Sequence, residues 1–128
     1  MEVGKKILIV EDDQFLREFY QELLEGEGYH IDVAGDGETA SQKMLEGGYN
    51  LVMLDIMLPK KDGLQVLRDL KITPPRQKNG PIVVLTNLGQ DAIIKQAFDL
   101  GAAGYIVKSA MNPDQVLDEI NNYIQSSV

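Results

Sequence analysis

Four short apolar runs in this sequence end at polar residues that can bind metal ions or transfer groups. The polar residues are Glu11-Asp12-Asp13 after Val10, Asp55 after Leu54, Thr86 after Leu85, and Lys108 after Val107. Each run is too short for a helix and rich in β-branched or aromatic residues, which is typical of a buried strand. In an open parallel sheet the carboxyl ends of the strands lie along one rim, where ligands bind. The sequence therefore predicts that these side chains converge.

Three of the converging side chains are the carboxylates of Glu11, Asp12 and Asp55. Held close together they would repel one another, and at least one pKa should rise unless a cation occupies the site. Mg²⁺ takes oxygen ligands and typically uses one or two carboxylates together with phosphate oxygens and water. We therefore expect a Mg²⁺ site, for which no histidine or cysteine ligand is needed.

Thr86 and Lys108 add a hydroxyl donor and a positive charge to this rim. A group that forms between them and a metal ion should be anionic with several acceptor oxygens, and a phosphoryl group fits this description best. The nucleophile could be Asp55, because a carboxylate can form an aspartyl phosphate while the metal and Lys108 offset the charge. The expected product is an acyl phosphate on the protein.

The elements that must hold these residues alternate between strand and helix. Strands are predicted at Ile7–Val10, Ile31–Ala34, Leu51–Leu54, Ile82–Leu85 and Tyr105–Val107, and helices at residues 14–25, 38–46, 63–71, 90–100 and 113–125. The second strand carries polar Asp32 among apolar residues, as expected of an edge strand. Alternation with short connections implies βαβ units, so the predicted fold class is α/β, a doubly wound five-stranded parallel sheet with five helices.

Local signals refine these elements. The first helix places apolar residues at spacings of three and four from Phe15 to Leu24. Asp13 could cap that helix instead of binding metal, and Asn112 is a plausible cap for the last one. The segment Ile72–Pro81 holds three of the five prolines and is interpreted as an exposed loop.

Length, charge and composition exclude several function classes. At 128 residues the chain is expected to form a single domain over 1–128. Its formal net charge of -8 opposes direct binding to the phosphate backbone of nucleic acid. The absence of cysteine excludes disulfides and thiolate chemistry. The start of the sequence has no apolar stretch long enough for a signal peptide or a membrane span, so we expect a cytoplasmic protein.

Several ordered motifs resemble one known family. The motifs are ILIVEDD, LVMLDIMLPKKDG, IVVLT and GAAGYIVK, spread over roughly residues 5–125. Together they look like the receiver domain of bacterial two-component response regulators. The resemblance implies a flavodoxin-like sheet with strand order 2-1-3-4-5 and a phosphorylation-activated signalling switch, which modifies itself and is not expected to turn over an external substrate.

The resemblance also implies a role for each rim residue. Asp55 matches the phosphoacceptor, Glu11 and Asp12 the acidic pair that holds Mg²⁺, and Met57 the residue whose backbone carbonyl joins the metal. Thr86 and Lys108 match the residues that bind the phosphoryl oxygens, Tyr105 matches the aromatic residue whose rotation follows the threonine hydroxyl inward, and Pro59 and Gly63 match the turn after the acceptor.

The family receives its phosphoryl group from a phosphohistidine on a sensor histidine kinase or a histidine phosphotransfer protein. It then presents an altered surface to an output partner, which here would span about residues 90–125. Apolar residues on the last two expected helices permit a homodimer without requiring one. The chain stops soon after the last helix, so we expect it to act through a partner or to be a fragment of a longer regulator.

Two residues depart from the family's common pattern. Ser109 follows Lys108 where proline is common, and a cis bond before a non-proline residue is costly, so a trans or strained bond is expected. Asn87 follows Thr86 where a small residue is common, which could alter donor access. Met57 and Leu88 flank the expected site with apolar side chains that cannot orient a water, so we hypothesise slow self-dephosphorylation.

Three other functions remain as alternatives. The main one is a degenerate receiver that binds a partner without phosphorylation, although the acceptor, the acidic pair, Thr86 and Lys108 are all present. A phosphatase with an aspartyl phosphate would usually carry a carboxylate two residues beyond the nucleophile, where Met57 stands. A flavin carrier would need a Ser/Thr/Gly-rich loop after the first strand, where Glu11-Asp12-Asp13 would repel phosphate.

Overall fold

Strand and helix alternate along the whole of the chain that the computed structural model describes, which is residues 4–87, 90–108 and 110–126. In chain order the elements are β1 (Lys6–Val10), α1 (Gln14–Glu25), β2 (His30–Ala34), α2 (Gly37–Glu46), β3 (Leu51–Asp55), α3 (Gly63–Ile72), β4 (Ile82–Thr86), α4 (Asp91–Asp99), β5 (Gly104–Val107) and α5 (Pro113–Ser126). Every strand and helix predicted from the sequence is present, and no bound differs from the predicted one by more than one residue.

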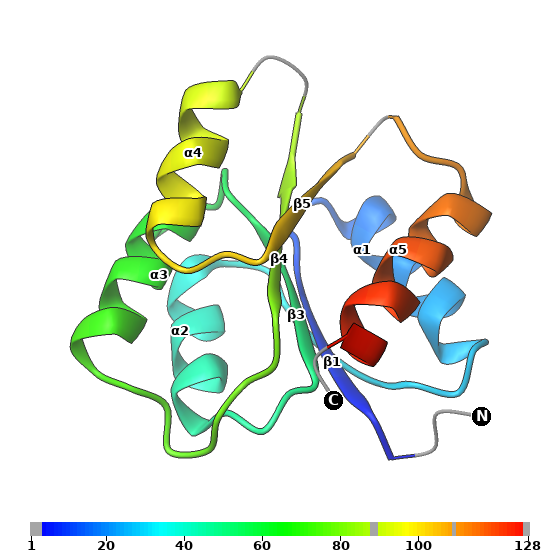
Figure 1. The fold of residues 1–128 in the computed structure, drawn as a ribbon, viewed down its shortest axis with the longest axis horizontal. Coiled ribbons are helices and arrows are strands. Elements are labelled where there is room, and N and C mark those ends of the chain that lie inside the picture. Colours follow the sequence, from blue (N-terminus) through cyan, green and yellow to red (C-terminus); the bar gives the residue numbers. More distant parts are fainter. Residues whose placement is uncertain (1–3, 88–89, 109, 127–128) are drawn as a thin grey trace.

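Within these ranges the strands form one parallel five-stranded sheet of order β2-β1-β3-β4-β5. Helices α2, α3 and α4 cover one face and α1 and α5 the other (Figure 1). This arrangement confirms the predicted doubly wound, flavodoxin-like fold and places β2 at an edge. The register pairs Val10 with Leu54, Asp55 with Leu85, and Thr86 with Val107, so the carboxyl ends of these strands are level with one another.

The three central strands are buried because helices cover both faces of the sheet. Alternate residues of a strand point to opposite faces, so Leu8 and Val10 belong to the apolar cluster on one side, and Ile7 and Ile9 to the cluster on the other. A strand buried on both faces must be continuously apolar, which explains the short apolar runs in the sequence. None of the described helices is long and apolar enough to cross a membrane.

Side-chain caps fix where several helices begin. Asp13 accepts a hydrogen bond from the backbone N–H of Leu16 (3.1 Å), and Asn112 accepts one from the backbone N–H of Gln115 (2.9 Å), which confirms both predicted caps. The apolar pattern of α1 predicted more burial than exists. Phe15 begins that pattern but is 82% exposed, because the stripe is wider than the surface that packs on the sheet.

The predicted loop before β4 is shorter than expected, since Ile72 ends α3 and the loop runs from Thr73 to Pro81. It is tied down by backbone hydrogen bonds, with the N–H of Arg76 donating to Leu45 (2.7 Å) and the N–H of Gly80 to Tyr49 (2.7 Å). Gly47 has φ 78°, and a Cβ there would lie 1.7 Å from the carbonyl oxygen of Gln77. Only glycine fits this close backbone approach.

Candidate functional site

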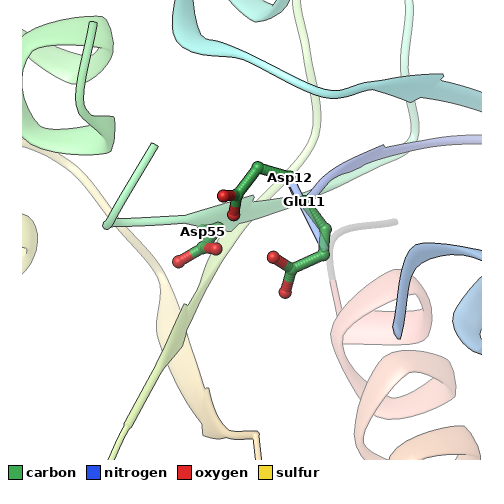
Figure 2. A group of neighbouring side chains, drawn as sticks. All are labelled: Glu11, Asp12 and Asp55. Carbon is green, nitrogen blue, oxygen red and sulfur yellow. The ribbon is translucent and has the colours of Figure 1, made fainter. Parts of the chain in front are cut away.

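The acidic residues predicted to converge do so at the carboxyl ends of β1 and β3. One carboxylate oxygen from each of Glu11, Asp12 and Asp55 lies within 4.8 Å of the others. Figure 2 shows the three side chains turned toward a common space, with Glu11 and Asp12 following β1 and Asp55 ending β3. The register between β1 and β3 is the cause, because it brings these residues to the same level of the sheet.

Burial separates the three carboxylates into two kinds. Glu11 is 0% and Asp55 1% exposed, whereas Asp12 is exposed to solvent. Burial raises the pKa of Glu11, and the neighbouring Asp55 carboxyl raises it further. The sequence predicted a raised pKa from mutual repulsion, and the direction is confirmed, although loss of hydration is the larger cause.

Lys108 brings the positive charge to the two buried carboxylates. Its Nζ donates to Asp55 Oδ2 at 2.7 Å and lies 2.9 Å from Glu11 Oε1. Burial alone would lower the pKa of Lys108, but the Asp55 and Glu11 carboxylates outweigh burial and raise it, so the ammonium stays charged. The contact with Glu11 is an ion pair without hydrogen-bond geometry, and Oε1 has no hydrogen-bond donor among the described residues.

Thr86 ends β4 beside this cluster, but its hydroxyl donates to a residue outside the cluster. It is buried, and its hydroxyl donates to the side-chain oxygen of Gln90 and lies 3.2 Å from the carbonyl oxygen of Asn87. An open cavity of about 520 Å³ lies above Asp55 and is lined by Glu11, Asp12, Asp13, Leu16, Asp55, Met57, Asn87 and Lys108. Thr86 is not one of the described residues that line this cavity.

The turn after Asp55 holds the Asp55 carboxylate in place. The backbone N–H of Met57 donates to Asp55 Oδ1 at 3.1 Å, while the Met57 side chain is 58% exposed. Gly63 closes the turn by donating its N–H to the carbonyl of Ile56 at 2.8 Å, and a Cβ at Gly63 would lie 2.5 Å from the Asp55 carbonyl oxygen. The carbonyl of Pro59 accepts from the N–H of Lys61 at 2.7 Å, which completes the predicted turn.

The remaining predicted residues lie on the β5 side of the site. Tyr105 is 44% exposed, and its ring packs edge-on against Phe98 of α4, with centroids 6.3 Å apart. Asn87 is exposed at the rim of the cavity. Leu88 and Ser109, on which the expectations about dephosphorylation and the Lys108 peptide bond depend, lie outside the described residues.

Two residues at this site were missed by sequence reasoning. Gln90 accepts the Thr86 hydroxyl hydrogen and also the backbone N–H of Asn87 at 2.9 Å. Arg17 of α1 donates from Nη1 to the backbone carbonyl of Glu11 at 2.8 Å and thereby supports the end of β1. Neither residue belongs to a motif in the sequence, and their contacts appear only once the rim is folded.

The arrangement is chemically suited to a hard cation and an anionic group. All three clustered ligand atoms are carboxylate oxygens, and one buried oxygen of Glu11 lacks a directed donor, which a Mg²⁺ ion with its bound waters would offset. The Lys108 ammonium beside Asp55 offers a counter-charge for oxygen atoms added to that carboxylate. The residues therefore fit Mg²⁺ and a phosphoryl group.

A comparison with known protein families decides the family. The family model described as the response regulator receiver domain matches residues 7–121. This chain belongs to the response regulator receiver domain family. The match confirms the resemblance seen in the sequence and places the chain among the proteins of two-component signalling.

Curated relatives of this receiver domain are longer proteins. The chain is 41% identical to the transcriptional regulatory protein ResD of Bacillus subtilis over 103 residues, which cover 80% of this chain and 41% of ResD. It is 39% identical to the transcriptional regulatory protein DltR of Streptococcus agalactiae over 115 residues, which cover 90% of this chain and 50% of DltR. The receiver domain thus spans about half the length of the curated relatives it matches.

Solved structures share the fold. The BeF3-activated N-terminal receiver domain of Klebsiella pneumoniae RstA is 33% identical with a TM-score of 0.81, covering 94% of this chain and 99% of that one. The receiver domain of the Pseudomonas aeruginosa sensor histidine kinase PA1611, solved with a magnesium ion coordinated in its active site cleft, is 22% identical with a TM-score of 0.82 and covers 96% and 99%. The latter similarity shows the fold alone.

Proposed function

We propose that this chain is a phosphorylation-activated switch that accepts a phosphoryl group from a phosphohistidine donor onto Asp55 with the help of Mg²⁺. The observation that carries the proposal is the single cluster in which Asp55, two further carboxylates and the Lys108 ammonium meet beneath an open cavity. An acceptor for phosphoryl transfer needs such a combination of nucleophile, metal ligands and counter-charge.

In the proposed step a lone pair of an Asp55 carboxylate oxygen attacks the phosphorus of the phosphohistidine. A new O–P bond forms, the P–N bond to the imidazole breaks, and the released imidazole nitrogen takes up a proton from water. The Met57 N–H and the Lys108 ammonium, each bonded to a different Asp55 oxygen, orient the carboxylate for this attack. Lys108 then pairs with a phosphoryl oxygen, and the product is an acyl phosphate.

Glu11 and Asp12 would hold Mg²⁺ together with Asp55 and the backbone carbonyl of Met57. The bound ion supplies Lewis-acid stabilisation of the charge on the transferring phosphoryl group. The PA1611 receiver, whose fold this chain shares, carries magnesium in its active site cleft, which supports the assignment. The chain modifies only itself in this scheme and turns over no external substrate.

The donor is a sensor histidine kinase or a histidine phosphotransfer protein, and the output is a changed surface over about residues 90–125. Thr86 and Tyr105 are the residues proposed to carry the change from Asp55 to that surface. In this proposal, the unphosphorylated state has the Tyr105 ring exposed and the Thr86 hydroxyl bonded to Gln90.

The test is the intact mass of the protein after incubation with acetyl phosphate and Mg²⁺. A gain of one phosphoryl group is expected, which is lost in Asp55→Asn and when the metal is chelated. Asp62→Asn is a matched control, because Asp62 only caps α3 and asparagine caps equally well. No gain from acetyl phosphate or from a phosphorylated histidine protein would contradict the proposal and favour a phosphorylation-independent binding module.

A further inference from the structure

Two hydrogen-bond donors at the end of β4 share one acceptor, the side-chain oxygen of Gln90. The hydroxyl of buried Thr86 donates to it, and so does the backbone N–H of Asn87 at 2.9 Å. The donors lie on successive residues, so the Gln90 side chain folds back over the β4 terminus and meets both. Two donors on one oxygen fix the position of that side chain.

The hydroxyl hydrogen of Thr86 goes to Gln90 and not to Asp55. The hydrogen bonds of the Asp55 carboxylate come from the Met57 N–H and the Lys108 ammonium in the described part of the chain. Asn87 lines the cavity above Asp55, whereas Thr86, one residue earlier and buried, is not among the described residues that line it. The Thr86 hydroxyl is therefore near the site, but its hydrogen is donated to Gln90.

Among the described residues, the hydrogen bonds of the Gln90 side chain go to the end of β4 and not to its own helix. It stands at the N-cap position of α4, yet its side chain makes no capping hydrogen bond to that helix. The first turn of α4 instead begins with acidic Asp91, which favours the helix N-terminus electrostatically. The Gln90 side chain thus serves the β4 terminus and not its own helix.

We propose that Gln90 is a positioning residue that holds the Thr86 hydroxyl away from Asp55 until a phosphoryl group competes for it. The inference rests on the proposed function and deepens it, because it names what keeps the switch off. A phosphoryl oxygen can capture the hydroxyl only after the bond to Gln90 breaks, so this bond weakens the response to phosphorylation. Removing the acceptor oxygen should make the active arrangement easier to reach.

The experiment measures how readily the protein takes up beryllofluoride, a stable phosphoryl mimic, in the presence of Mg²⁺. Gln90→Met keeps the length of the side chain but removes its acceptor, whereas Gln90→Glu retains an acceptor. Gln96→Met makes the same chemical change at an exposed position of α4 and serves as the matched control. The half-saturating beryllofluoride concentration is followed by amide NMR.

We expect Gln90→Met to reach half-saturation at a concentration roughly three- to tenfold lower than the parent, the effect of one competing hydrogen bond. Gln90→Glu should need at least as much beryllofluoride as the parent, and Gln96→Met the same amount. Before beryllofluoride is added, the Asn87 amide resonance should move in Gln90→Met but not in Gln96→Met. A merely structural role for Gln90 would not produce this pattern.

Two outcomes overturn different statements. If the parent binds beryllofluoride and Gln90→Met shows the same half-saturation, the positioning role of Gln90 is wrong while the proposed switch stands. If the parent binds no beryllofluoride with Mg²⁺ and gains no phosphoryl group from acetyl phosphate or a phosphohistidine protein, the proposed function itself fails and the inference falls with it.

Discussion

The two ends of the sheet are stabilised in opposite ways. At the carboxyl end, Glu11 and Asp55 are buried charges that depend on a single ammonium, Lys108, and exposed Asp12 adds a third negative charge. At the amino end, the Thr73–Pro81 loop is fastened by backbone hydrogen bonds, including those from Arg76 and Gly80. One end concentrates buried charge, whereas the other is held mainly by bonds between neutral backbone groups, beside an exposed ion pair between Arg76 and Glu46.

The difference indicates that the charged side chains of the candidate site destabilise the carboxyl end of the sheet. Among the described residues, the buried side-chain atom that lacks a hydrogen-bond partner is Glu11 Oε1, which lies at the carboxyl end. The carboxylates at this end repel one another, and the pKa of Glu11 is raised by burial and by Asp55. Such a cluster of carboxylates is stabilised most by a bound cation. Removing the exposed negative charge of Asp12 from this cluster should therefore raise stability, whereas removing the Lys108 cation or disturbing the backbone contacts at the amino end should lower it.

The largest effect on stability is expected at the amino end, from Gly47→Ala. The new Cβ would lie 1.7 Å from the Gln77 carbonyl oxygen, and the residue has φ 78°. Left-handed strain and the clash together should lower the free energy of unfolding by about 3 kcal/mol in urea titrations. Phosphorylation of the fraction that remains folded should be unchanged.

Gly26→Ala is the control for this prediction. Gly26 has φ -61°, and the nearest atoms to a Cβ there lie at an ordinary 3.4 Å. The free energy of unfolding should change by less than about 0.5 kcal/mol. Equal effects of the two substitutions would show that the close approach of Gly47 to Gln77 contributes nothing.

At the carboxyl end, Lys108→Met removes the cation shared by two buried carboxylates. Without Mg²⁺ the free energy of unfolding should fall by about 2 kcal/mol, less than for a fully buried pair, because Glu11 can take up a proton. Added Mg²⁺ should recover part of the loss. Urea titrations with and without Mg²⁺ measure both, and a variant as stable as the parent without the metal would contradict the role of Lys108.

Asp12→Asn should have the opposite sign. Without Mg²⁺ it relieves repulsion within the cluster, so the free energy of unfolding should rise by about 1 kcal/mol. Because a ligand is lost, the stabilisation by Mg²⁺ that we expect in the parent should largely disappear.

Asp13→Asn is the matched control for Asp12→Asn. Asp13 caps α1 and asparagine caps as well, so this variant should keep both the stability and the Mg²⁺ response of the parent. Urea titrations with and without Mg²⁺ compare the two variants. A full Mg²⁺ response in Asp12→Asn would remove Asp12 from the metal site.

Asp36, after β2 on the same rim, should show the smallest effect. The Thr39 N–H, then the Thr39 hydroxyl and Lys60, hold the pKa of Asp36 below its ordinary value. A lowered pKa adds stability above the ordinary value near 4, and this stability is lost as pH falls through the folded-state pKa. The advantage of the parent over Asp36→Asn in urea titrations should thus shrink below pH about 4, and an advantage independent of pH would contradict this.

The strands, the residues at the carboxyl end of the sheet and one helix cap can be predicted from the sequence. The apolar runs predicted the buried strands, and the parallel topology that follows from alternating strand and helix placed Glu11, Asp12, Asp55 and Lys108 at one rim. The cap at Asp13 followed from the residue type that precedes an apolar helical pattern. These features are local or follow from general rules of α/β sheets, so they need no coordinates.

Contacts between distant segments and the directions of side chains could not be predicted from the sequence. The apolar pattern of α1 does not say that Phe15 points to solvent, since that depends on where the sheet ends beneath the helix. The bridge between Gly47 and Gln77 joins two loops that no periodicity connects. The choice of Gln90 by the Thr86 hydroxyl depends on a rotamer, which spacing in the sequence does not encode.

The most direct test of the account is to locate the phosphoryl group chemically. Borohydride reduces an acyl phosphate on aspartate to the alcohol, so peptide mass spectrometry after phosphorylation and reduction identifies the modified residue. We expect homoserine at position 55, formed only when Mg²⁺ was present during phosphorylation. Homoserine at Asp12 or Asp13, or reduction products that form equally well without Mg²⁺, would contradict it.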